Sequence, residues 1–131
     1  MSDEKRAEIV REAVAESIPA PIEDVRLESI LMEELGADSL TFLDIVFRLE
    51  EAFDIEITRG EIESAARGGM SAEAFAPDNI ISEAGLKRLR ELMPEAAGRI
   101  QPGLKVGQIY TLFTVRTFLN IVDGKLDGAA L

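Results

Sequence analysis

The sequence predicts an all-α protein, and three observations support that prediction. The apolar residues are mostly Leu, Ile, Ala and Val, aromatic residues make up only 5% of the chain, and Glu is abundant; this composition favours helix over strand. Apolar residues recur at the spacing of an amphipathic helix in several segments. Ser, Thr or Asp precede these segments and Pro or Gly follow them, as at the ends of helices.

Length and composition limit the class of protein. A chain of 131 residues corresponds to one domain, spanning 1–131, which can bury a core without disulfides or structural metals. Cys and His are absent, which excludes disulfides, Ser-His and Cys-His nucleophile pairs and the commonest metal ligand. We therefore expect neither an enzyme nor a metal site. The sequence has no signal-peptide pattern and no apolar run of bilayer length, so we expect a cytoplasmic location without membrane insertion.

The net charge of −11 bears on the partners. It argues against nucleic acids and anionic membrane surfaces, which bind clusters of Lys and Arg. It is compatible with basic protein partners, and equally with acidity that serves only solubility.

The first helix is predicted over 3–17. Ser2 or Asp3 can cap it, its apolar residues follow helical spacing, and Pro19 ends it. A connection over 22–36 follows, with several apolar anchors and a Gly at its end.

The second helix is predicted over 39–53. Asp38 is a suitable N-cap, and its carboxylate also suits the positive end of the helix dipole. The predicted apolar face of this helix comprises Leu40, Leu43, Val46, Phe47, Leu49 and Phe53. Charged residues lie largely off that face.

The sequence of the second half of the chain predicts three more helices. Thr58 and Glu61 have the spacing of a capping box, which indicates a short helix over 58–67. A further helix is expected over 82–92, and a last one over 114–122 with a C-terminal cap at the following Gly124. The segments between these helices are predicted to be irregular, with at most a helical turn.

A short motif lies at the predicted start of the second helix. Residues 35–40 read Leu-Gly-Ala-Asp-Ser-Leu, so that Ser39 follows a Gly and the capping Asp38. A Ser at a helix start presents its hydroxyl to solvent, and a phosphate there lies near backbone N–H groups and the positive dipole end. A bare Asp-Ser-Leu often only caps a helix. Together with its flanks, 29–35 and 49–57, the motif resembles the phosphopantetheine attachment site of acyl carrier proteins.

The resemblance implies a cofactor and its residues. Ser39 would bear a covalent 4'-phosphopantetheine arm, taken from coenzyme A, that holds acyl groups as thioesters. Asp38 would serve the modifying transferase through a metal held with coenzyme A, and Leu40 completes the motif. Such a carrier needs no catalytic residue of its own, which agrees with the absence of Cys and His.

The resemblance also implies partners. They are a phosphopantetheinyl transferase, a ligase or synthase that loads the acyl group, and an acyltransferase that removes it, each acting on a monomeric carrier in fatty-acid or lipid biosynthesis. Asp44, Glu50 and Glu51 would dock on basic patches of these enzymes, although a solvated helix face is the plain alternative.

Three residues of this helix depart from the family pattern. Thr41 and Phe42 stand where the family usually has an acidic and a small polar residue, and Arg48 places a positive charge among the acids. Phe42 is expected to be exposed beside the arm, as a partner contact or folded onto the acyl chain.

The resemblance covers 1–57 and resumes at 114–122, so residues 58–112 read as an insertion or as an enlarged third-helix region, with 61–67 as the remnant of that helix. The expected fold is thus an acyl-carrier-type helical bundle with extra helices inserted before the last one. The insertion is too apolar for a solvated linker and should pack against the bundle. One hypothesis is that it enlarges or covers the acyl pocket for long or unusual chains. The alternatives are an extra partner-recognition surface or a segment without a functional role. The core residues expected to admit an acyl chain are Leu43, Val46, Phe47, Phe53 and Ile57.

Two other functions remain open from the sequence. A peptidyl or aminoacyl carrier of a non-ribosomal pathway shares the Ser motif, although the acidic second helix favours the fatty-acid type. An unmodified helical interaction module is the other alternative.

Overall fold

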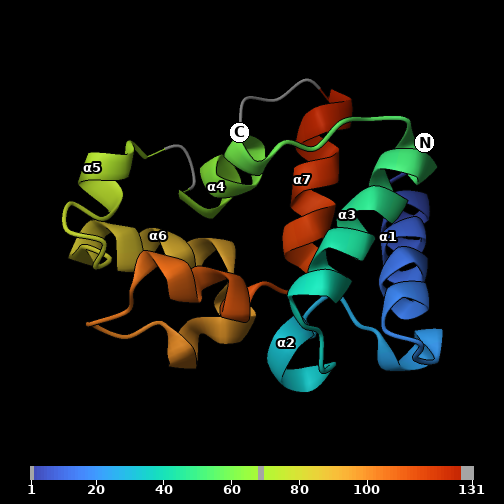
Figure 1. The fold of residues 1–131 in the computed structure, drawn as a ribbon, viewed down its shortest axis with the longest axis horizontal. Helices are drawn as coiled ribbons and strands as arrows, with labels where there is room; N and C mark the ends of the chain where they lie inside the picture. The colour runs from blue at the N-terminus through green and yellow to red at the C-terminus, as the bar shows by residue number, and fades with distance from the viewer. Residues whose placement is uncertain (1, 68–69, 128–131) are drawn as a thin grey trace.

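The computed structural model of the chain describes residues 2–67 and 70–127, and these ranges are built from helices (Figure 1). In chain order the elements are α1 (Asp3–Ser17), η1 (Ile22–Asp24), α2 (Leu31–Glu34), α3 (Ser39–Phe53), α4 (Arg59–Arg67), α5 (Ala72–Phe75), α6 (Glu83–Leu92), η2 (Pro94–Arg99), η3 (Val106–Leu112) and α7 (Val115–Asp127), where η marks a 3₁₀ helix. Strand pairing in the described ranges amounts to two isolated bridges, Ile30 with Thr114 and Ile80 with Lys105. The predicted all-α class is confirmed.

The helices form a bundle with a second layer beside it. α1, α3 and α7 lie side by side, and α4 packs against α7 (Figure 1). α6 packs against α4 and also contacts α5 and η2, which lie away from α7 (Figure 1), while η3 contacts α2. Apolar residues of 58–112, among them Phe75, Leu89 and Ile109, belong to the same buried core cluster as residues of α1 and α7. None of the helices in the described ranges is long and apolar enough to cross a bilayer.

The first half of the chain folds largely as its local signals predict. α1 covers the predicted residues, and the Ser2 hydroxyl caps it by accepting from the Lys5 backbone N–H at 3.2 Å. The connection at 22–36, for which no helix was predicted, contains η1 and α2. Arg11 fastens it to α1, because its guanidinium donates to the carbonyls of Val25 at 2.6 Å and Ile22 at 2.9 Å.

α3 has the predicted bounds, but the prediction of its inward face was partly wrong. Leu40, Leu43 and Phe47 are 77%, 56% and 63% exposed. The buried stripe comprises Phe42, Ile45, Val46, Leu49 and Phe53. This stripe also has helical spacing, so the helix carries two apolar stripes. Which of the two is buried depends on how the neighbouring helices pack against α3. The expectation that Phe42 is exposed was wrong for the same reason.

The later helices differ from prediction mainly at their ends. α4 and α6 match the segments predicted at 58–67 and 82–92 to within a residue, and the Ser82 hydroxyl caps α6. α7 continues to Asp127, so Gly124 is a buried residue inside the helix and not its C-terminal cap. Tertiary ion pairs hold the extra turn: Lys125 Nζ lies 2.6 Å from Glu61, and Arg6 Nη2 lies 3.0 Å from Asp127.

The segments expected to be irregular contain short helices that periodicity does not detect. They are α5, η2 and η3. α6 approaches α5 closely at Gly85, where an added Cβ would lie 2.7 Å from the Phe75 carbonyl oxygen. That contact explains why this helical position carries no side chain.

Candidate functional site

Ser39 is the first residue of α3, and the backbone before it is fixed by short-range contacts. Gly36 has a φ of +73°, a left-handed conformation that glycine adopts without strain. The backbone N–H of Ala37 donates to the Leu31 carbonyl at 3.0 Å, which fastens the turn to α2. The main chain of Ser39 therefore lies at the positive end of a 15-residue helix. Its side chain lies outside the described part of the structure.

Asp38 is the N-cap that the sequence predicts. Its Oδ1 accepts from the backbone N–H of Thr41 at 2.8 Å and from the Thr41 hydroxyl at 2.9 Å. The backbone hydrogen bond is the larger cause, and the hydroxyl the second, of a pKa held below the usual range of an aspartate. Asp38 is therefore a carboxylate at neutral pH, next to Ser39. Thr41, a departure from the family pattern, supplies the second of these hydrogen bonds.

An apolar stripe follows Ser39 along α3. It consists of Leu40, Leu43 and Phe47, at spacings of three and four residues, and each is more than half exposed. Contiguous exposed apolar side chains of this kind are a mark of contact surfaces.

The predicted acidic docking residues differ in their surroundings. Asp44 accepts from Arg48 Nε and from the Ser17 hydroxyl, each at 2.8 Å, and these two bonds, in that order of size, lower its pKa. Arg48 also binds Glu16 at 2.8 Å, so its positive charge joins α1 to α3 and is not an isolated cation among acids.

Glu50 and Glu51 lie near the end of α3. Glu50 Oε2 accepts from the backbone N–H of Ile57 at 2.8 Å and so fastens the chain that follows α3. Glu51 is exposed, and its carboxylate has no hydrogen bond or ion pair with the described residues. Of the three predicted docking residues, Glu51 is thus the one whose carboxylate is turned to solvent.

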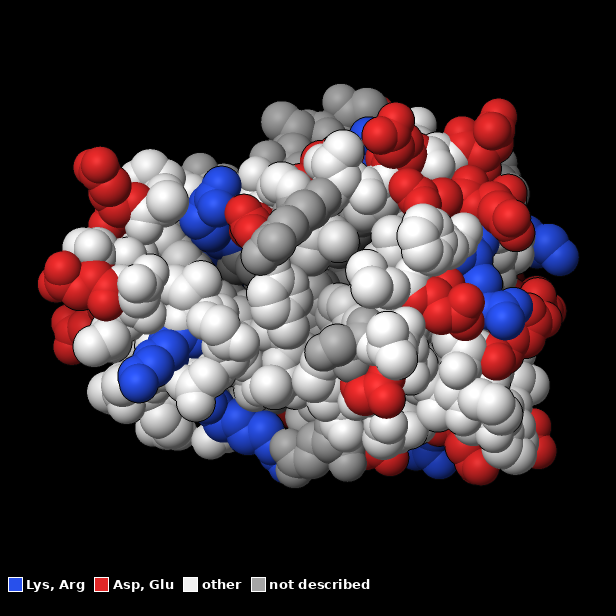
Figure 2. All heavy atoms as spheres, viewed as in Figure 1, with Lys and Arg blue, Asp and Glu red and all other residues white. Residues whose placement is uncertain are grey.

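The acidity as a whole is concentrated in the first part of the chain. Residues 1–57 carry 16 acidic and 5 basic side chains, whereas residues 58–131 carry 9 of each, so the net charge of −11 lies entirely in residues 1–57. Figure 2 shows acidic side chains gathered over α1 and α3, and acidic and basic ones mixed over α5 and α6.

A pocket of about 840 Å³ opens between α3, α4 and η3. Four of the five residues expected to admit an acyl chain line it, namely Leu43, Val46, Phe47 and Ile57. The fifth, Phe53, is not among its lining residues and is buried in the core. Residues of η3 supply a wall, through Gly107, Tyr110 and Thr111.

An aromatic cluster joins that wall to the bundle. The Phe42 ring centroid lies 6.1 Å from that of Tyr110, 5.6 Å from that of Phe113 and 5.0 Å from that of Phe118. Sequence reasoning missed this cluster, since Phe42 was expected at the surface and Tyr110 lies in the insertion. The aromatic residue at position 42, a departure from the family pattern, was the one signal in the sequence that could have indicated such a contact.

Comparison with known proteins identifies the family of the region around Ser39. Residues 8–66 match the family model described as a phosphopantetheine attachment site, a match that ends within α4. An acyl carrier protein of Campylobacter concisus (strain 13826) is 45% identical over 56 residues, which cover 43% of this chain and 73% of the relative.

Two further relatives give the same result. An acyl carrier protein of Campylobacter curvus (strain 525.92) is 44% identical over 54 residues, covering 41% of this chain and 70% of the relative. An acyl carrier protein of Sulfurovum sp. (strain NBC37-1) is 42% identical over 60 residues, covering 46% of this chain and 80% of the relative. No solved structure matches the chain. The chain therefore belongs to the acyl carrier protein family, whose members hold acyl groups on a covalently attached 4'-phosphopantetheine and present them to biosynthetic enzymes.

Proposed function

We propose that Ser39 is the residue that bears the 4'-phosphopantetheine arm and that its thiol carries fatty-acyl or related lipid intermediates. The observation that carries this proposal is the position of Ser39 as the first residue of α3, directly after the Gly36 turn and the Asp38 cap, inside the matched region. The arm supplies the thiol that forms the thioester. The chain's own residues place that arm and bind what it carries.

The charge of Asp38 suits an arm that leaves the protein surface. The phosphodiester of the arm and the Asp38 carboxylate are both anions, so they repel each other when they share the helix start. The capping hydrogen bonds from Thr41 hold the carboxylate on its own helix. The phosphate is then turned toward solvent, and the arm, with a reach on the order of 20 Å, can serve several enzymes. We assign Asp38 a further role toward the modifying transferase, through the metal that accompanies coenzyme A.

Peptide mapping tests the attachment residue. After incubation with coenzyme A and a phosphopantetheinyl transferase, trypsin should cut after Arg26 and Arg48 and release a peptide that carries the added mass. That peptide holds Ser29, Ser39 and Thr41, and fragmentation should assign the mass to Ser39. Assignment to either of the other hydroxyls would refute the proposal.

The proposed partners are the transferase, a ligase or synthase that loads the arm, and an acyltransferase that unloads it, acting on a monomer in the cytoplasm. The proposed docking face combines the apolar stripe of Leu40, Leu43 and Phe47 with nearby acids. Asp44 and Glu50 belong to this face, but each also holds part of the fold. Glu51 therefore offers the cleaner test of electrostatic docking.

Glu51→Lys is expected to slow modification by the transferase at low salt, because it reverses an exposed charge that faces a basic partner. We expect kcat/KM to fall by roughly 3- to 10-fold, equivalent to about 0.7–1.4 kcal/mol. The effect should shrink at high salt, since exposed charges are screened beyond about 10 Å at 0.1 M.

Glu91→Lys is the matched control. Glu91 is also exposed and lies in the last turn of a helix, α6, on the far side of α4. It should leave the rate of modification unchanged. Equal rates for the two variants at low salt would remove Glu51 from the docking face.

We also infer that residues 58–112 belong to the single carrier domain and form part of its acyl pocket. The support is the wall that η3 contributes to the 840 Å³ pocket and the aromatic cluster that holds this wall against α3. Each buried CH₂ contributes about 0.8 kcal/mol, so an eight-carbon chain entering the pocket gains several kcal/mol. A pocket extended in this way suits the carrier to long or unusual chains.

Amide exchange tests this role of the insertion. Octanoylation of the phosphopantetheinylated protein is expected to slow exchange in α4 and η3, because both line the pocket. Exchange in α6, which does not line it, should stay the same and serves as the internal control. If only amides adjoining Ser39 respond, the insertion is not part of the acyl pocket.

A further inference from the structure

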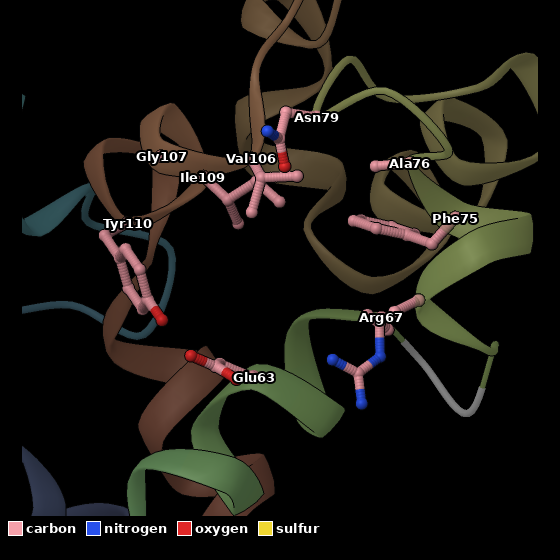
Figure 3. A pocket seen from close by; sticks show the side chains of 10 residues that line it. Glu63, Arg67, Phe75, Ala76, Asn79, Val106, Gly107, Ile109 and Tyr110 are labelled. Atoms are coloured by element: carbon pink, nitrogen blue, oxygen red, sulfur yellow. The ribbon is translucent and has the colours of Figure 1, made fainter.

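We propose that a second pocket, built by the inserted segment, binds the distal end of an acyl chain too long for the first pocket. This pocket lies between α4, α5 and η3 and has a volume of about 330 Å³ (Figure 3). Its apolar lining comes from Ala72, Phe75, Ala76, Val106 and Ile109. The proposal rests on the proposed attachment at Ser39 and on the first pocket as its entrance.

The two pockets meet at η3. Gly107 and Tyr110 line both of them. Tyr110 is held in place by aromatic packing, with its ring centroid 5.4 Å from that of Phe113 and 6.1 Å from that of Phe42. It forms a fixed wall between the pockets, and Figure 3 shows its hydroxyl pointing toward Glu63.

Gly107 leaves room beside that wall. A Cβ built at this position would meet nothing within 4 Å. A chain that runs along α3 in the first pocket therefore reaches η3 at a point where no side chain blocks it. The same residue opens onto the second pocket, so the two volumes are consecutive compartments for one extended ligand.

The lining of the second pocket favours a hydrocarbon ligand. The charged side chains of the pocket are engaged elsewhere: the Arg67 guanidinium donates to the Met70 carbonyl at 3.2 Å and to the Ser64 hydroxyl at 3.4 Å. Glu63 also has a partner in the structure. The remaining surface is mostly methyl, methylene and ring carbon, which favours the apolar end of an acyl chain over a polar ligand.

Backbone contacts hold the walls of the second pocket together. The backbone N–H of Val106 donates to the Asn79 carbonyl at 3.0 Å, and that of Ile81 to the Leu104 carbonyl at 2.8 Å. The start of η3 is thus fastened to the segment that follows α5. The pocket is largely formed before a chain enters, so a ligand need not order it.

The test compares octanoyl and hexadecanoyl forms of the full chain, each loaded by the transferase from the corresponding acyl-coenzyme A. The probes are the amides of Phe75 and Ala76, which donate to the carbonyls of Ser71 and Ala72 at 2.9 Å. Hexadecanoylation should slow their exchange by roughly tenfold, whereas octanoylation should leave it unchanged. Equal exchange in the two forms would overturn the proposal.

Gly107→Leu should remove the hexadecanoyl response at Phe75 and Ala76, because the new side chain fills the passage. Gly98→Leu is the matched control: Gly98 also lies in a 3₁₀ helix, a Cβ there also meets nothing within 4 Å, and it lines neither pocket. This variant should respond as the wild type does. Ala72→Leu, which fills only the second pocket, should reproduce the loss if Gly107→Leu fails to fold.

The possible outcomes distinguish a failure of the second pocket from a failure of the proposed function, which is attachment of the acyl-bearing arm at Ser39. If no acyl group can be loaded onto Ser39, the proposed function fails. If loading succeeds and octanoylation slows amide exchange in α4, but hexadecanoylation does not slow exchange at Phe75 and Ala76, only the second pocket is refuted. A hexadecanoyl response that persists in Gly107→Leu would show that the chain does not pass beside this glycine.

Discussion

Ser39→Ala is expected to abolish attachment of the phosphopantetheine arm completely while the protein keeps its fold. The methyl group of Ala offers no oxygen to form the phosphodiester, so no residual modification should remain at this position. Asp38, not Ser39, supplies the capping interaction of α3, and Ala is the best helix former. The free energy of unfolding should therefore change by no more than about 0.5 kcal/mol. Intact mass after incubation with coenzyme A and transferase, together with thermal unfolding, measures both effects.

Ser29→Ala is the control for this experiment. Ser29 is 8% exposed, and its hydroxyl accepts from the backbone N–H of Arg26 at 3.1 Å. Its loss should lower stability by about 0.5–1.5 kcal/mol and leave modification complete. A Ser39→Ala protein that still gains one arm would show that the attachment residue lies elsewhere. A Ser29→Ala protein that folds but remains unmodified would count equally against Ser39.

The start of the site was predictable because its determinants are local. Asp38 caps α3 through a hydrogen bond to a residue three positions on, and Gly36 makes the turn that precedes it. Both signals lie within a few residues of Ser39 and need no knowledge of the rest of the fold. The bounds of α1 and α3 follow from the same kind of evidence.

The inward face of α3 was not predictable from its own residues. Val46, Leu49 and Phe53 lie in one apolar stripe with Phe42, whereas Leu40, Leu43 and Phe47 form a second. The first stripe is the one that faces the rest of the bundle, because α1 packs against α3 and the Phe42 ring contacts that of Phe118 in α7. Exposure of the second stripe beside Ser39 is what makes it available to partners, so the mistaken assignment concealed part of the candidate site.

The wall of the pocket depends on contacts that span most of the chain. Phe42 and Phe118 are far apart in the sequence, and Tyr110 lies in a short 3₁₀ helix that has no periodic signal. The extra turn of α7 has a similar origin, since Glu61 and Arg6 hold residues beyond Gly124. Apolar content predicted that residues 58–112 pack against the bundle, and a place beside the acyl pocket was one hypothesis, but the residues that make the contact could not be predicted.

Phe113→Ala is expected to cause the largest loss of stability of any variant considered, about 3–5 kcal/mol. The Phe113 side chain is fully buried, and its ring lies among those of Phe42, Tyr110 and Phe118. It lies between η3 and α7, and its carbonyl accepts from the backbone N–H of Leu31 at 3.0 Å. Truncation leaves a cavity between η3, α3 and α7 that these neighbours cannot close without moving.

The cost is large against the 5–15 kcal/mol that usually stabilises a domain, so the variant should unfold at a markedly lower urea concentration. Phe47→Ala is the matched control, because it removes the same side chain from a position that is 63% exposed; it should change stability by no more than about 0.5 kcal/mol. Tyr110 loses one of its aromatic supports in Phe113→Ala, so the pocket wall should loosen even where the fold survives. Similar unfolding midpoints for the two variants would mean that the insertion does not depend on the aromatic cluster for its attachment to the bundle.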